Sequence, residues 1–145
     1  MTIKFLITFL LITLSLQKDT DSTGDAIAWT ASYYEGYPVV EGESGPDAFD
    51  APGLCVWAYY ENKITLPPTI EEQFKTGKEI DFYDVDNGDL MFFDCDHKGT
   101  ATHVGIYMGN GEMLHAFQDG GVVEYADVDS EYFSSRFVGA RRPWE

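Results

Sequence analysis

The spacing of hydrophobic and polar positions changes along the chain. In the first part, Asp19–Tyr34 and Ala51–Asn62 carry apolar residues at helical spacing, each following residues that favour helix N-caps. Thr69–Thr76 adds a short amphipathic helix, which Gly77 closes. Between the first two segments, Gly36–Asp50 is rich in glycine, proline and acidic residues and is predicted to be an irregular loop. This part of the chain is therefore predicted to be mainly helical.

The second part of the chain has the pattern of short strands. Asn110-Gly111 is typical of a two-residue hairpin turn. Helices followed by an antiparallel meander predict an α+β fold, and a length of 145 residues allows one domain. The predicted strands are Asp89–Phe93, His103–Met108, Glu112–Phe117, Val122–Tyr125 and Val138–Arg142.

The segment Met1–Gln17 has the pattern of a cleavable secretory signal. Lys4 precedes an apolar run, Phe5–Leu14, that is too short to span a bilayer comfortably. We therefore expect residues 1–17 to be removed, residues 18–145 to form a single domain, and the mature protein to be secreted without a membrane attachment. A buried N-terminal strand or helix is the alternative for this segment.

The composition is that of a strongly acidic globular protein. The chain has 25 acidic and 9 basic residues, a net charge of −16, and 15% aromatic residues, which is high for a disordered acidic chain. Removal of residues 1–17 takes away one lysine and no acid, so the mature charge becomes −17. Because phosphates repel such a charge, nucleic acid and anionic lipid surfaces are not expected as partners.

Several short motifs follow one another between Asp25 and Pro143. They read GYP, FDAPGL, LP, NGDLMFF, HVGIYMGNG, LHA and FVGARRP. Their order and spacing resemble the NlpC/P60 family of cysteine peptidases. The resemblance implies a papain-like α+β core, with N-terminal helices packed on an antiparallel sheet of about five to six strands. It also implies a secreted hydrolase that cuts stem peptides of peptidoglycan and needs no cofactor.

The resemblance assigns three catalytic positions. The nucleophile position at the start of the central helix is Ala51, the general base is His103, and the third polar residue is His115. A thiol at a helix N-terminus is favoured as thiolate, and the free N–H groups there can hold an oxyanion. Counting outward from the hairpin turn places His115 within a few residues of His103 across the hairpin, where it can orient the His103 ring.

The chain departs from the family at the nucleophile. The methyl group of Ala51 neither ionises nor attacks a carbonyl, so the chain as written is expected to be inactive. Two interpretations are open. Ala51 is either an introduced Cys→Ala change in an active peptidase, or the mark of a natural pseudoenzyme that binds peptidoglycan or a protein partner without cutting it.

Substrate contacts are expected around the start of the central helix, at Asp50, Val39, Pro52 and Gly53. In the family, the aspartate at this position is associated with holding a free N-terminal amine of the peptide. Pro52 and Val39 stand where the family usually has a serine and a tyrosine that help. We therefore expect a weaker hold on a free amine than the family pattern implies.

The cysteines offer less specific signals. Cys55 lies inside an apolar helix and is predicted to pack in the core. A disulfide between Cys55 and Cys95 is compatible with secretion, and two separate thiols are equally compatible. The stretch Cys95–His97 with His103 lacks the spacing of a zinc site, so no metal is predicted.

Aromatic residues of the first helical segment have two interpretations. Trp29 and Trp57 are predicted to pack helix on helix. Tyr33, Tyr34 and Tyr37 lie nearer the predicted active-site loop, and lining a groove is the alternative to packing for them.

Overall fold

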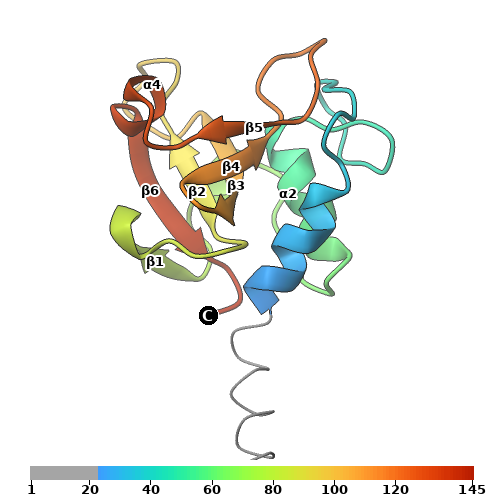
Figure 1. The fold of residues 1–145 in the computed structure, drawn as a ribbon, viewed down its shortest axis with the longest axis horizontal. Helices are drawn as coiled ribbons and strands as arrows, with labels where there is room; N and C mark the ends of the chain where they lie inside the picture. The colour runs from blue at the N-terminus through green and yellow to red at the C-terminus, as the bar shows by residue number, and fades with distance from the viewer. Residues whose placement is uncertain (1–22) are drawn as a thin grey trace, which may run out of the picture.

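The computed structural model describes residues 23–145, so the expected leader at residues 1–17 lies outside the described part. A first helix covers residues 23–32 and lies beside α2, against the sheet (Figure 1). The helices and strands that follow are α2 (Ala51–Tyr60), α3 (Ile70–Gln73), β1 (Lys78–Ile80), the 3-10 turn η1 (Phe82–Asp84), β2 (Leu90–Phe93), β3 (His103–Gly109), β4 (Glu112–His115), β5 (Glu124–Asp127), α4 (Glu131–Ser134) and β6 (Phe137–Arg142).

The six strands form one sheet in the order β1-β6-β2-β3-β4-β5, and every neighbouring pair is antiparallel. The predicted α+β fold with an antiparallel sheet is therefore confirmed. Asn110 and Gly111 join β3 to β4 with φ angles of 55° and 76°, and Gly109 lies opposite Glu112. Positive φ at both turn residues is what a tight hairpin of this hand requires, and it explains the Asn-Gly pair.

Two short elements were not predicted from the sequence. β1 has only three residues, of which the first two are exposed, so its sequence carries no readable alternation. It pairs with β6 at the sheet edge. α4 is a single turn in which the side chain of Ser130 accepts a hydrogen bond from Phe133 N. Both elements depend on long-range packing more than on local pattern.

The predicted strand Val122–Tyr125 is wrong by two residues, because β5 begins at Glu124. The residues before Glu124 form backbone hydrogen bonds with the loop before α2 instead. Val123 N donates to Tyr37 O, and Gly36 N donates to Val123 O. Val122 and Val123 therefore pair with the loop before α2, and β5, which pairs with β4, begins after them.

The main core lies between the helices and one face of the sheet, and a second buried cluster, which includes Met91, Phe93 and Phe133, covers the other face. Leu54, Cys55, Ala58 and Tyr59 of α2 are fully buried, which confirms the core prediction for Cys55. The prediction for Trp29 is wrong, since 68% of this residue is exposed. The first helix turns other residues of its sequence, Ile27 and Ala31 among them, toward the core.

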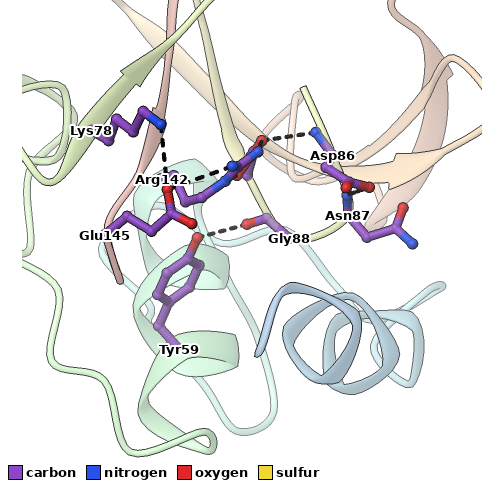
Figure 2. Close-up of polar contacts among 8 residues, drawn as sticks. Tyr59, Lys78, Asp86, Asn87, Gly88, Arg142 and Glu145 are labelled. Atoms are coloured by element: carbon purple, nitrogen blue, oxygen red, sulfur yellow. Dashed lines mark hydrogen bonds and ion pairs between the residues drawn. The ribbon is translucent and has the colours of Figure 1, made fainter. Parts of the chain in front are cut away.

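A buried polar network fixes the last turn of α2 to the sheet (Figure 2). The carboxylate of Asp89 is inaccessible and accepts two hydrogen bonds of 2.9 Å from Arg142. Burial raises the pKa of Asp89, and the paired guanidinium opposes that rise. The hydroxyl of Tyr59 donates to Gly88 O at 2.6 Å. The ion pair joins β6 to the segment before β2, where removing one partner of a buried pair costs about 3–5 kcal/mol. The Tyr59 hydrogen bond attaches the last turn of α2 to the same segment.

Candidate active site at the start of α2

Asp50 connects the start of α2 to the preceding loop. Its Oδ1 accepts a hydrogen bond of 2.7 Å from Gly53 N, which caps the helix, and its Oδ2 accepts one of 2.9 Å from Gly42 N. Both carboxylate oxygens are therefore engaged by backbone N–H groups. The position is fixed by the local sequence, because Asp is a favoured N-cap residue and Pro52 is tolerated in a first turn.

Gly53 permits a close approach of this loop to the helix. A Cβ built on Gly53 would lie 2.2 Å from the carbonyl oxygen of Glu43 and 2.7 Å from Asp50 Oδ1. Any side chain here would push the loop away from the first turn of α2. The glycine is thus required by packing around the helix start.

One backbone N–H group in the first turn of α2 is not used by the Asp50 cap. Pro52 has no N–H, and the N–H groups of Gly53 and Leu54 donate to the side chain and carbonyl of Asp50. The N–H of Ala51 is the remaining one, and it belongs to the residue at the predicted nucleophile position. A backbone N–H at this place is suited to an oxyanion.

Gln73 holds the same helix start from the other side. It is fully buried, and its Nε2 donates to Pro52 O at 3.2 Å and to Pro67 O at 2.9 Å. Sequence analysis did not single out this residue. In the sequence, Gln73 is only a polar residue in a short amphipathic helix, and such residues are usually on the surface.

The two predicted histidines are in direct contact. His103 is the first residue of β3, His115 is the last of β4, and His103 Nε2 lies 2.8 Å from His115 Nδ1. One of the two nitrogens donates and the other accepts. Continuing the register past the Ile106–Leu114 pair places Gly105 opposite His115, so His103, two residues further along the same face of β3, reaches His115 diagonally.

The first turn of α2 and His103 lie at the same end of the sheet. Tyr59, near the far end of α2, contacts Gly88, which precedes β2. β3 runs antiparallel to β2, with His103 opposite Phe93 at the end of β2, and α2 packs on β3. Tyr59 follows Ala51 by eight residues, or about 12 Å of helix, so the first turn of α2 points toward the end of the sheet at which His103 lies.

Aromatic side chains enclose the histidine pair. The Phe117 ring centroid lies 5.0 Å from that of His103 and 5.3 Å from that of His115, and Phe133 lies 5.4 Å from His115. Only 4% of His103 and 2% of His115 is exposed. Sequence analysis missed both phenylalanines. Phe133 lies in α4, which the sequence pattern did not reveal, and Phe117 was expected to continue a strand.

This enclosure keeps both histidines neutral. Burial, helped by the neighbouring His115, lowers the pKa of His103 to about 3. Burial lowers the pKa of His115 to about 4. At neutral pH the pair is therefore an uncharged base whose ring orientation is fixed by one hydrogen bond.

The remaining predicted residues divide between the site and the core. Ala51 and Pro52 are half-buried at the helix start. Val39 is 4% exposed, forms an isolated bridge with Phe49 and belongs to the hydrophobic core. The side chain of Val39 is therefore packed in the core and is almost inaccessible to a substrate.

The other candidate features lie elsewhere. Cys55 and Cys95 are both free, so the disulfide is not formed. His97 is exposed in the loop after β2. Within residues 23–145, no group of three or more His, Cys, Asp or Glu side chains is placed to hold a metal ion, and no helix has the length and hydropathy to cross a bilayer.

Comparison with known proteins places this fold and site in a family. Bifunctional muramidase/DL-endopeptidase CwlT of Bacillus subtilis (strain 168) is 40% identical over 111 residues, which make up 75% of this chain and 33% of that protein. Murein DD-endopeptidase MepH of Escherichia coli (strain K12) is 36% identical over 111 residues, 74% of this chain and 41% of that protein. The chain thus spans a third to two fifths of the length of these relatives.

A solved structure and a family model agree with these relatives. An NlpC/P60 family protein from Bacillus cereus ATCC 10987 superposes with a TM-score of 0.78 at 28% identity, over 84% of this chain and 40% of that one. The model of the NlpC/P60 family matches residues 36–142, which include the start of α2 and both histidines. The chain therefore belongs to the NlpC/P60 family.

Proposed function

We propose that this chain is a peptidoglycan stem-peptide peptidase domain in a form that lacks its nucleophile. In this proposal, position 51 is the place of the nucleophile, His103 is the general base and acid, and His115 orients the His103 ring. The relatives named endopeptidases support the reaction class. The observation that carries the proposal is the 2.8 Å contact between two buried histidines at the end of the sheet where α2 begins.

The chemistry explains why a cysteine at position 51 would complete the site. A thiol at the first residue of α2 would lie at the positive end of the helix dipole, and its own backbone N–H would face the developing oxyanion. His103 would take the thiol proton and later deliver it to the leaving amine. Ala51 provides the N–H and none of the nucleophile, so the chain binds a peptide without cutting it.

Restoring the thiol tests the proposal. The Ala51→Cys variant should release peptides from purified peptidoglycan or soluble muropeptides, as followed by chromatography and mass spectrometry, while the chain as written should release none. A thiol-alkylating reagent should abolish this activity. Because Cys95 is half-exposed, the reagent is also tested on the Ala51→Cys, Cys95→Ser protein, which should respond identically. A folded Ala51→Cys variant that is inactive on all wall types contradicts the peptidase proposal.

A second function is favoured by one specific observation. A cysteine–histidine pair works best when the imidazole can become charged, and here burial lowers the pKa of His103 to about 3. A site that keeps its histidines uncharged suits a binding module that holds peptidoglycan or a protein partner without hydrolysis. For that function, an inactive Ala51→Cys variant would still bind tetrapeptide as tightly as the chain as written.

We also propose that the domain covers residues 18–145 and is secreted after removal of residues 1–17. The support is the signal-like pattern around Lys4. Expression of the full chain, followed by N-terminal sequencing of the protein recovered from the medium, tests both points. A protein retained in cells with Met1 in place contradicts them.

A further inference from the structure

A second recess lies on the helical side of the molecule, away from the start of α2. It encloses about 270 Å³. Glu61 at its rim follows Ala51 by ten residues along α2, which corresponds to about 15 Å along the helix axis. The recess shares no residue with the candidate active site, although its Tyr34 and Tyr37 pack on Phe49, the residue before Asp50. It is lined by Trp29, Thr30, Tyr33, Tyr34, Tyr37 and Glu61.

Four aromatic rings form most of this recess. The Trp29 and Tyr33 ring centroids are 6.0 Å apart with their planes at 84°, and those of Tyr34 and Tyr37 are 5.0 Å apart at 77°. Because the two rings of each pair are nearly perpendicular, their faces point in different directions and form separate walls of the recess. About two thirds of Trp29 and of Tyr33 is exposed. Large rings exposed together mark an interaction site.

The electrostatics of the recess favour a cation. Aromatic faces are the negative part of the ring quadrupole, and they attract cations placed over them. Glu61 adds a carboxylate, which accepts a hydrogen bond from the Tyr34 hydroxyl. None of the six lining residues is basic, and the chain as a whole carries −16.

The polar groups of the recess restrict which cation fits. Thr30 Oγ1 already donates to Ala26 O and accepts from Asn62 Nδ2. One oxygen of Glu61 is engaged by Tyr34. A primary ammonium needs several acceptors to replace its water shell, whereas a methylated ammonium needs none. The second oxygen of Glu61 remains as an acceptor, and one charged oxygen beside several aromatic rings matches a methylated ammonium.

We propose that this recess binds a quaternary ammonium group of the choline type, with the ring faces of Trp29 and Tyr33 against the methyl groups and Glu61 near the charge. The site is independent of the peptidase chemistry, because it uses none of the residues at the start of α2. The same headgroup occurs in small molecules and in lipids, and the experiment separates these two sources.

Choline is the first probe, titrated into the chain as written and followed by calorimetry and by the indole N–H resonances. The control ligand is 3,3-dimethyl-1-butanol, which has the same shape without the charge. We expect choline to bind at least about tenfold more tightly than the alcohol. Trp29→Ala should weaken choline binding about tenfold. Tyr83→Ala, which removes an aromatic ring that is 93% exposed and outside the recess, should leave choline binding unchanged.

Further binding experiments identify the chemistry of the ligand. Butylammonium should bind more weakly than choline, and Glu61→Gln should weaken choline binding more than it weakens binding of the alcohol. Co-sedimentation with phosphatidylcholine vesicles, but not with phosphatidylglycerol vesicles, assigns a lipid headgroup. Choline binding without vesicle binding assigns a small molecule. Equal affinity for choline and the alcohol, tighter binding of butylammonium, or an unaltered Trp29→Ala variant overturns the proposal. Circular dichroism of each variant confirms that it is folded.

Discussion

His103 Nε2 and His115 Nδ1 share one hydrogen bond of 2.8 Å inside an aromatic enclosure. The contact has room for a single proton, so the two rings act as one unit with a donor and an acceptor. This arrangement fixes the direction of the His103 ring and also disfavours its charged form. The pair therefore fixes the orientation of the His103 ring, while burial, helped by His115, lowers its pKa.

The first prediction separates the roles of the histidines in the Ala51→Cys background. His103→Ala should lower kcat by about 10²–10⁴-fold, because proton transfer is lost. His115→Ala should lower it less, since orientation supplies only part of the barrier reduction. The control is His97→Ala, at an exposed histidine in the loop after β2, which should leave kcat unchanged. A larger loss for His115→Ala at equal stability reverses the assignment.

The second prediction concerns stability against pH. The folded-state pKa values of His103 and His115 lie below the unfolded value near 6.5. The unfolded chain therefore binds more protons as the pH falls below 6.5, and stability is lost down to the folded pKa values of about 3 and 4. Between pH 7 and pH 5, one such histidine lowers the free energy of unfolding by about 2 kcal/mol.

Urea unfolding of the chain as written at pH 5, 6 and 7 measures this loss. His103→Gln should reduce the slope of the unfolding free energy against pH over this range, while His97→Gln should preserve it. A slope that is the same in the His103→Gln protein means that other groups cause the pH dependence.

The third prediction concerns Phe117, whose ring packs on both histidines and is partly exposed. Phe117→Ala should admit water and raise the pKa of His103 and of His115 toward 6.5, because burial is the first cause of both shifts. NMR titration of the imidazole protons measures this. Tyr125→Ala, at a partly exposed ring on β5, should leave both values unchanged. Unaltered pKa values in Phe117→Ala would assign the enclosure to other residues such as Phe133.

The fourth prediction concerns the free amine of the peptide. Both oxygens of Asp50 already accept backbone hydrogen bonds, from Gly53 and from Gly42. A substrate amine would therefore approach a carboxylate whose negative charge is already partly neutralised by two backbone N–H groups. We expect a free tetrapeptide and its N-acetylated form to bind the chain as written within about tenfold of each other by calorimetry, since an exposed charge contact adds about 1 kcal/mol. A much larger preference for the free amine contradicts this expectation.

The helix around Ala51 and the hairpin around Asn110 were predictable because their signals are local. An N-cap, a proline in the first turn and an Asn-Gly turn each act within a few residues. The hairpin count predicts that His115 lies within a few residues of His103, and the structure shows the two rings in contact. The sequence also predicts the helix start and the histidines as one site only through the family resemblance, because no local signal relates residues so far apart.

The features that sequence analysis missed depend on tertiary contacts. Phe133 reaches the histidines from a one-turn helix, which is too short to show a period. Gln73 is buried because the carbonyl groups of Pro52 and Pro67 need a donor there. Trp29 was expected to be buried because it is large and apolar, and residue type alone does not reveal which side of a helix faces the core.

The position of β6 in the sheet has a consequence for how the chain folds. β6 is the last of the described strands in sequence, yet it lies between β1 and β2. A chain made from its N-terminus exposes two open strand edges, and the carboxylate of Asp89 lacks its guanidinium, until Phe137–Arg142 has been added. Folding intermediates that precede this insertion are open to edge-to-edge association. The nascent chain therefore depends on β6 for solubility as well as for structure.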